Sequence, residues 1–347
     1  MLRPETTLPP NKRQKGLNLI MRENLERKKR IPVFLAADER YARYLGVAVA
    51  SVSHFASEEY LYDVRILSSG FSRTSAERIR RSVKPNVKVT VCDMKRVTER
   101  ISESLSFRLR DYYSEAIYYR MFIPSVFPDL KKAVYIDADT VLNSDIADLY
   151  FTEMGDNLLA GVTDESVVTV PVFCDYVMRQ IGLTAPSQYI NSGVIVLNLD
   201  RMRRERIEEQ FLYLITRYNF NTVAPDQDYL NFLCKGRIKY LDSGWNKHAI
   251  EGRDIANSRL HLIHFNMFNK PWHYDAVPME EYFWEMAKKT DFYSELTAEK
   301  EGYTERDKAM DFAAAEKLLW LAKDIYENGE SMSENAQKIV FAKAGVL

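Results

Sequence analysis

The stretch AVYIDADTVLNSDI, residues 133–146, decides how the rest of the sequence is interpreted. It begins as a run of apolar and β-branched residues and then reaches two acids, Asp137 and Asp139, with only Ala138 between them. On an extended chain, side chains two residues apart project from the same side. Two carboxylates held this close repel each other and are costly to desolvate, so we expect a cation between them.

Apolar runs of this kind recur along the chain and alternate with helical patterns. Strands are expected at 33–37, 64–69, 87–93, 133–137, 158–164, 193–200, 238–241 and 260–265. Helices are expected at 43–56, 74–84, 111–123, 201–218 and 226–235. Such alternation is typical of an α/β fold with a mainly parallel central sheet flanked by helices.

An aspartate stands at the end of five of the expected strands: Asp38, Asp93, Asp137, Asp164 and Asp200. The carboxyl ends of parallel strands meet at one edge of a sheet, and ligands of α/β proteins bind there. The sequence therefore predicts that these acids share one edge with a binding site.

The chain divides into three parts by composition. Residues 1–30 form a basic arm with nine Lys or Arg against three Glu, and 17–30 has the pattern of a short basic amphipathic helix. We interpret the arm as a solvated segment, with contact to a membrane surface or a partner as the alternative. Residues 31–274 would form the α/β domain, and residues 275–347, which carry helical patterns only, a C-terminal helical appendage.

The end of the appendage, residues 306–347, holds six basic and seven acidic groups, so it is not a polybasic membrane anchor. Apolar residues recur there at helical spacing: Met310, Phe312, Leu318, Leu319, Leu321 and Ile325. Such a stripe must be buried against the body of the protein, a second subunit or a membrane edge. We expect protein contact, and a homodimer through these helices is one form of it.

The bulk composition excludes several classes of protein. With 347 residues, 46% of them hydrophobic, the chain can bury a large core. The net charge of −1 gives no overall basic field for nucleic acid. The three cysteines are far apart, as expected of buried thiols in a reducing compartment. With no membrane-spanning run and no signal peptide, we expect a cytoplasmic protein, at most peripheral at the inner face of the membrane.

Two chemistries compete for the Asp-Ala-Asp pair. The pair would either bind a divalent metal that holds a nucleotide-sugar diphosphate, or supply the nucleophile of a haloacid-dehalogenase-like phosphatase, whose D-x-D-x-T opening DADTV fits. That phosphatase family needs this strand first and a later G-D-x-x-x-D motif. Here the strand comes fourth, and Gly155-Asp156 is followed by Asn-Leu-Leu-Ala. No glycine-rich phosphate loop occurs either, so the metal interpretation is favoured.

A metal held by two carboxylates needs a further ligand, and LHLIHFNMFNKPW, residues 260–272, offers one. His264 ends an expected strand and leads into a polar loop that contains Lys270. Mixed carboxylate and imidazole ligands suit Mn²⁺ better than Mg²⁺ or Ca²⁺, which favour oxygen ligands. Lys270 would add a positive charge near a phosphate.

Six motifs in order make the sequence resemble the family 8 glycosyltransferases. They are FLAADERY, the Tyr-Tyr-Arg at 118–120, YIDADTV, YINSGVIVLNL, PDQDYLNFL and H-x5-K-P-W. The resemblance covers roughly residues 31–274 and is nearest to bacterial lipopolysaccharide galactosyl- and glucosyltransferases, with glycogenin more distant. It implies a GT-A fold, a UDP-glucose or UDP-galactose donor, Mn²⁺ and retention of the anomeric configuration. The acceptor would be a glycan, a glycoprotein or a lipid-linked sugar.

The resemblance also implies a role for each matching residue. The donor would be bound by Ala36, Asp38, Tyr41, Arg120, Asp137, Ala138, Asp139, Asn191, Ser192 and Lys270. The metal ligands would be Asp137, Asp139 and His264, and the catalytic residues Asp164, Asp226 and Gln227. Because an amide is a poor nucleophile, we favour attack by the acceptor on the face that the leaving group departs from. A covalent route through Asp164 or Asp226 is the alternative.

Some of these residues also have simpler interpretations. Asn191-Ser192-Gly193 before an apolar strand is typical of a turn, and Asp226-Gln227-Asp228 is typical of a helix N-terminus. One position departs from the family pattern H-x-x-G-x-x-K-P-W, because Met267 replaces the Gly that permits φ > 0 and a close approach to phosphate. A UDP-sugar-binding protein without transfer activity is the alternative from another class of function.

Overall fold

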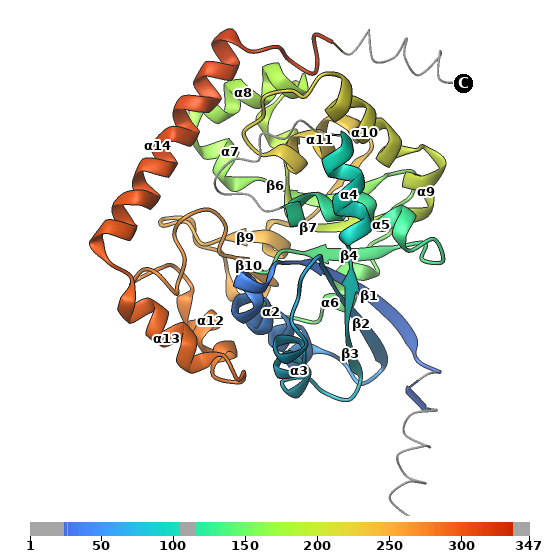
Figure 1. The fold of residues 1–347 in the computed structure, drawn as a ribbon, viewed down its shortest axis with the longest axis vertical. Helices are drawn as coiled ribbons and strands as arrows, with labels where there is room; N and C mark the ends of the chain where they lie inside the picture. Colours follow the sequence, from blue (N-terminus) through green and yellow to red (C-terminus); the bar gives the residue numbers. More distant parts are fainter. Residues whose placement is uncertain (1–23, 26, 105–114, 336–347) are drawn as a thin grey trace, which may run out of the picture.

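The computed structural model describes residues 24–25, 27–104 and 115–335 (Figure 1). The helix expected over 17–30 lies mostly outside these residues, and so does the end of the appendage, residues 336–347. Within the described part, helices pack on both faces of one central sheet, which confirms the α/β fold.

A seven-stranded sheet in the order β3-β2-β1-β4-β7-β6-β8 forms the centre. Its strands are β1 (Lys29–Ala36), β2 (Tyr60–Ser68), β3 (Val87–Asp93), β4 (Ala133–Ile136), β6 (Leu159–Thr163), β7 (Ile190–Leu197) and β8 (Ile238–Tyr240). All neighbouring pairs are parallel except the two that involve β7. The apolar runs of the central strands are buried, as strands covered on both faces require. The mainly parallel sheet is confirmed.

The reversed direction of β7 corrects two predictions. Its carboxyl end lies at the opposite edge of the sheet, so Asp200 is not part of the shared edge and instead pairs with Arg204, 2.6 Å away. Its amino end carries Asn191, Ser192 and Gly193, which belong to the strand and not to a turn before it. An antiparallel strand thus supplies its first residues to the edge where parallel strands supply their last.

A second sheet of three short strands places the histidine motif beside the two aspartates. It has the order β5-β10-β9, with β5 (Thr140–Leu142), β10 (Leu262–His264) and β9 (Lys247–His248). β10 runs antiparallel to β5 and pairs His264 with Thr140, while the Phe265 amide donates to the Asp139 carbonyl at 3.0 Å. The short strands β5 and β9 were not expected from the sequence.

Helices cover the sheet in two groups, each with its own buried apolar cluster. On one face lie α2 (Ala42–Phe55), α3 (Arg73–Arg81) and α12 (Glu280–Ala287). On the other lie α4 (Lys95–Ser104), α5 (Tyr119–Val126), α8 (Pro171–Ile181), α10 (Ile207–Arg217) and α11 (Pro225–Leu233). Shorter helices are α6 (Ile146–Tyr150), α7 (Glu165–Thr169) and α9 (Leu199–Arg204).

The observed helices differ from the expected ones in three ways. The helix expected at 201–218 is divided into α9 and α10, because Arg206 between them is left-handed with φ of 54°. The helix expected at 111–123 appears as α5 after a short 3-10 turn, and residues 111–114 lie outside the described part. Helices α4, α6, α7 and α8 were not expected.

The appendage is helical, as expected, over its described residues. After α12 come α13 (Tyr293–Gly302) and α14 (Glu305–Asn328), and α14 runs along the side of the molecule from α13 to α8 (Figure 1). Ile325 is buried, and Leu318 and Leu321 pack against the cluster that includes α8. Phe312 is 65% exposed, and Met310 and Leu319 are also exposed, so the stripe is covered only in part.

Two further expectations concern thiols and membranes. All three cysteines are free, and only Cys234 is fully buried, where burial raises the pKa of its thiol to about 12. Cys92 and Cys174 are partly buried. Among the described residues, no helix combines the length and apolarity that a membrane span requires.

Candidate active site

One cavity of about 460 Å³ collects the residues that the sequence singled out. Every predicted donor-binding, metal-binding and catalytic residue lines it: Ala36, Asp38, Tyr41, Arg120, Asp137, Ala138, Asp139, Asp164, Asn191, Ser192, Asp226, Gln227, His264 and Lys270. The cavity lies at the edge of the sheet where β1, β4 and β6 end and β7 begins. Of the five strand-end acids, Asp93 and Asp200 do not line it.

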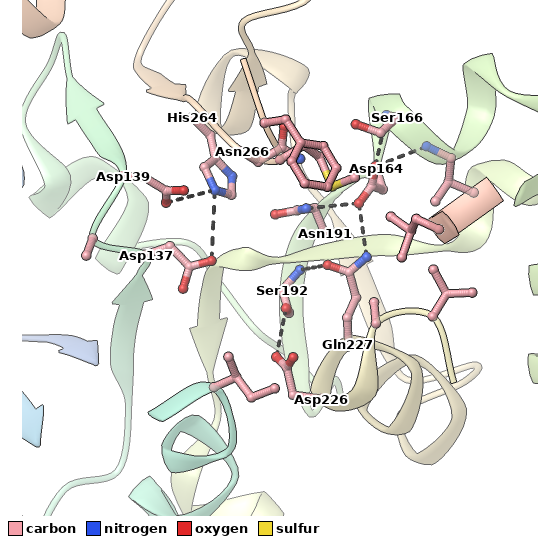
Figure 2. A pocket seen from close by; sticks show the side chains of 18 of the residues that line it. Asp137, Asp139, Asp164, Ser166, Asn191, Ser192, Asp226, Gln227, His264 and Asn266 are labelled. Atoms are coloured by element: carbon pink, nitrogen blue, oxygen red, sulfur yellow. Dashed lines mark hydrogen bonds and ion pairs between the residues drawn. The ribbon is translucent and has the colours of Figure 1, made fainter. Parts of the chain in front are cut away.

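Three of these side chains form a cluster with the geometry of a metal site. The ligand atoms of Asp137, Asp139 and His264 all lie within 4.8 Å of one another. The Nε2 of His264 is 3.2 Å from Oδ1 of Asp139 and 3.9 Å from Oδ2 of Asp137, and all three side chains point toward a common centre (Figure 2). Two carboxylate oxygens and one imidazole nitrogen fit a divalent metal such as Mn²⁺.

The carboxylate oxygen of Asp137 that points away from His264, Oδ1, accepts hydrogen bonds from one neutral and one positively charged donor. Its Oδ1 accepts from Nη2 of Arg120 and from the Tyr135 hydroxyl, each at 2.9 Å. The Nε of Arg120 lies 3.0 Å from Asp226, so one guanidinium bridges two buried acids. Burial alone would lower the pKa of Arg120, but the two carboxylates hold it above its usual range. This pairing fixes Asp137 with only Oδ2 directed to the cluster.

Lys270 pairs with Asp139 in the way that Arg120 pairs with Asp137. Its Nζ donates to Oδ2 of Asp139 at 2.5 Å and also to the carbonyl of Phe265. Burial would raise the pKa of Asp139, but Lys270 and His264 together hold it below its usual range. Asp139 therefore stays ionised with its Oδ1 facing His264, and the buried Lys270 ammonium lies directly beside the cluster.

The orientation of His264 is fixed by a residue that the sequence did not indicate. Its Nδ1 lies 2.9 Å from Oδ1 of Asn246, and Nδ2 of Asn246 donates to Oδ1 of Asn191 at 3.0 Å. Because the Asn246 amide nitrogen is used by Asn191, its oxygen faces the imidazole and accepts from Nδ1–H. The Nε2 lone pair is then free for a metal.

Beside the metal cluster, an amide and carboxylate network lines the next part of the cavity. Oδ2 of Asp164 accepts from Nδ2 of Asn191 at 2.9 Å and from Nε2 of Gln227 at 3.0 Å (Figure 2). Oε1 of Gln227 accepts from the Ser192 amide at 2.8 Å, and the Ser192 hydroxyl donates to Asp226 at 3.0 Å. Oδ1 of Asp164 caps helix α7. These polar groups are fixed in place before any ligand arrives.

Gly193 lies where two metal-cluster side chains meet the strand. A Cβ at this position would stand 2.3 Å from Cε1 of His264 and 2.5 Å from Oδ2 of Asp137. No real Cβ approaches other atoms so closely, so only glycine fits at this position of β7 when the cluster is formed.

At the other end of the cavity lie Ala36, Asp38 and Tyr41. The Asp38 carboxylate is held by Arg40, whose Nη2 is 2.8 Å away. Met267, which replaces the family Gly, has φ of 61°, so this position does require the left-handed region. Met267 adopts it with a side chain that is 42% exposed.

Several cavity residues carry no recognisable sequence signal. Ser166 and Asn266 line the cavity, and both lie near Nδ1 of His248, at 3.3 and 3.4 Å. His248 is buried, and burial lowers its pKa to about 4. Five residues of α14 also line the cavity, although they lie far along the chain from any motif.

A mainly parallel α/β sheet, with an Asp-x-Asp pair and a His grouped at its carboxyl edge beside a cavity, defines the class of GT-A glycosyltransferases. The chain belongs to glycosyl transferase family 8, whose model matches residues 32–276. The expected resemblance is confirmed, and the phosphatase alternative is not supported.

Individual relatives agree with this family. A putative glycosyltransferase of Haemophilus influenzae is 26% identical over 253 residues, which cover 70% of this chain and 72% of the relative. The lipopolysaccharide 1,2-glucosyltransferase of Escherichia coli is 29% identical over 185 residues, 49% of this chain and about half, 53%, of the relative. Among solved structures, galactosyltransferase LgtC in complex with donor and acceptor sugar analogs has a TM-score of 0.62 and 26% identity. The match covers 75% of this chain and 96% of the LgtC chain.

Proposed function

We propose that the protein transfers glucose or galactose from a UDP-hexose to a carbohydrate-bearing acceptor, with Mn²⁺ as cofactor and with retention. The observation that carries the proposal is that every residue given a donor-binding, metal-binding or catalytic role by the resemblance lines one cavity, which contains a carboxylate–imidazole cluster. Relatives named as glucosyl- and galactosyltransferases support a hexose donor. A cell-surface glycan such as lipopolysaccharide is the acceptor class that those names favour.

Different residues of the cavity would bind different parts of the donor. Ala36, Asp38 and Tyr41 would contact the uridine, and the network around Asp164 and Gln227 the hexose. Asp137, Asp139 and His264 would hold the metal, which when bound neutralises charge on the diphosphate as it leaves. The Lys270 ammonium adds a second positive charge at the same place.

The hydrogen bonds of the acids support attack on the face that the phosphate leaves. Asp226 is paired with Arg120 and accepts from Ser192, and both oxygens of Asp164 accept hydrogen bonds. Asp164 has donors on both of its oxygens, and Asp226 shares its Oδ2 between a guanidinium and a hydroxyl, so each is a weak nucleophile. As the bond from the anomeric carbon to the phosphate oxygen breaks, the acceptor oxygen bonds to that carbon. The acceptor proton passes to the departing phosphate.

The remaining parts of the proposal concern organisation. We assign transfer to residues 31–274 and packing to the appendage 275–347, and we assign neither role to the arm 1–30. The exposed face of α14 carries Phe312 and Trp320, 65% and 63% exposed, and we assign it to a second copy of the chain. Attachment to a membrane would be peripheral, on the cytoplasmic side.

The test is release of UDP from UDP-glucose and UDP-galactose after treatment with EDTA and then with Mn²⁺, Mg²⁺ or Ca²⁺. We expect EDTA to silence the enzyme and Mn²⁺ to restore it best. Asp139→Asn keeps the shape of the side chain and should abolish release, while Asp254→Asn, at an exposed position, should not. Full activity in EDTA would refute the metal role, and UDP-sugar binding without release would favour the silent binding protein.

A further inference from the structure

The wall of the cavity opposite the central sheet is made by helix α14. Five of its residues line the cavity: Asp311, Ala314, Lys317, Leu318 and Leu321. Their spacing of three or four residues places them on one face of the helix. The neighbouring Leu319 and Trp320 point elsewhere and are exposed, so α14 presents distinct inner and outer faces. Residues 305–328 lie beyond the region 32–276 that matches the family model, so this wall comes from outside it.

Helix α14 is fixed at both ends. Near its start, Oδ2 of Asp311 accepts from the hydroxyls of Tyr274 and Tyr303, at 2.9 and 2.7 Å. Toward its end, Ile325 is buried against the α8 side, and beyond it the Ser333 hydroxyl donates to the Arg179 carbonyl at 2.7 Å. A helix held at two distant points forms a wall that exists before a ligand binds.

The part of the cavity next to α14 differs in chemistry from the donor end. Leu318 and Leu321 pack against the apolar cluster that contains Phe173 and Val177 of α8, and these four side chains line the cavity together with Val223. The carboxylate, amide and ammonium groups that suit a diphosphate and a hexose come instead from the residues that follow β4 and β6, from β7 and α11, and from the loop after β10. α14 also brings two charged residues, Asp311 and Lys317, to the cavity, and Asp311 is held by the hydroxyls of Tyr274 and Tyr303. The apolar patch that Leu318 and Leu321 form beside them suits the carbon face of a sugar ring.

We infer that α14 closes the acceptor subsite, and that the apolar face of an acceptor sugar ring packs against Leu318 and Leu321. The inference rests on the proposed transfer from a UDP-hexose, because that reaction needs a second substrate next to the hexose. Gln227 and the inner face of α14 line the same cavity, so an acceptor bound against α14 would share that cavity with the donor hexose. α14 is then a determinant of acceptor specificity.

Leu318 and Leu319 form a matched pair for the test, because they are adjacent leucines of which only Leu318 lines the cavity, while Leu319 is exposed. Leu318→Trp fills the subsite, and Leu319→Trp adds the same volume outside it. Three quantities are measured for each: Mn²⁺-dependent UDP binding, UDP release by hydrolysis, and transfer to methyl and octyl β-D-glucosides and β-D-galactosides. Melting temperatures control for folding, and Leu318→Ala enlarges the same space.

We expect Leu318→Trp to raise the KM for the best glycoside about tenfold or more, with UDP binding and hydrolysis within about twofold of the unchanged chain. Leu319→Trp should change none of the three, and Leu318→Ala should shift preference toward bulkier glycosides. Equal effects of the two Trp variants would overturn the inference. So would intact UDP release with transfer to none of the glycosides. Absence of UDP binding and release in the unchanged chain would instead overturn the proposed function.

Discussion

His264 and Asn246 are joined by a contact of 2.9 Å between Nδ1 and Oδ1, and this contact links the metal cluster to the rest of the site. Through Asn191 and Asp164 the same chain of hydrogen bonds reaches Gln227. The imidazole is therefore oriented by the groups that line the hexose part of the cavity. Metal binding and hexose positioning share one hydrogen-bond network.

Asn246→Ala should lower Mn²⁺ affinity about 10- to 100-fold, because the imidazole loses the acceptor that sets its tautomer and orientation. Asn246→Asp keeps an acceptor for Nδ1–H and should recover most of that affinity. Titration of Mn²⁺ followed by its paramagnetic effect on water relaxation measures both. Asn257→Ala, at an exposed position, is the control. Unchanged affinity in Asn246→Ala would show that His264 is oriented by other contacts.

Gly193→Ala should disrupt the metal cluster, since its Cβ would overlap both His264 and Asp137. We expect a loss of about 1–3 kcal/mol in the free energy of unfolding from the overlap. Mn²⁺-dependent UDP binding should fall by about 100-fold or more, because two ligands are displaced at once. Gly70→Ala, where an added Cβ meets nothing within 4 Å, should leave both quantities unchanged. Calorimetry of unfolding and of UDP binding would decide.

Gln227→Ala should slow transfer by about 100-fold while the product keeps the same anomeric configuration, because one positioned polar contact is lost and no covalent step is removed. The anomeric configuration is determined by NMR of the product. Gln210→Ala, on α10, should leave the rate unchanged. A sugar adduct on Gln227 or Asp226, detected by mass spectrometry of the intact protein during slow turnover, would contradict same-face attack.

Asp228 predicts a dependence of stability on pH. The carboxylate accepts from the hydroxyls of Tyr176 and Tyr189, each at 2.6 Å, but burial raises its pKa to about 6. The folded state then binds more protons than the unfolded state between about pH 4 and 6, so stability falls as the pH rises through this range. The fall is about 3 kcal/mol, and it is complete above the folded pKa.

Asp228→Asn should remove this part of the pH dependence, measured as the urea midpoint from pH 4 to 7. Asp175→Asn, an exposed acid on α8, should retain it. A pH profile that is the same in both variants would show that Asp228 titrates normally.

The outer face of α14 predicts self-association. Replacing Phe312 and Trp320 by Ser should convert a dimer to a monomer in sedimentation experiments, because the largest apolar side chains of that face are removed. Glu316→Ala, also exposed on α14, should not. Deleting 306–347 should in addition lower the melting temperature, since Ala322 and Ile325 are buried against the body. A full-length chain that sediments as a monomer would refute the dimer.

Residues with a local pattern could be predicted, and residues placed by distant contacts could not. The strands, Asp137, Asp139 and His264 stand in apolar runs or motifs whose meaning is local. The direction of β7 depends on its partners β4 and β6, and for that reason Asp200 was placed at the wrong edge.

Asn246 and α14 illustrate the same limit within the site. Asn246 stands in a segment without periodicity, and only the pairing of β9 with β10 brings it to His264. The apolar spacing of α14 predicted a buried face, but not that part of the face would line the cavity. That assignment requires the contacts at both ends of the helix, which come from residues far apart in the chain.

The pairing of β5 with β10 also sets the moment at which a newly made chain becomes active. On the ribosome, β1, β4 and the two aspartates emerge early and can begin to pack, since folding proceeds from the N-terminus. His264 follows only after on the order of a hundred further residues, and the ends of that long loop must then meet. Until then Asp137 has Arg120 as its positive neighbour, and neither His264 nor Lys270 has reached the cluster. A nascent chain therefore holds its acids without the complete metal cluster until the segment that carries His264 and Lys270 has been made.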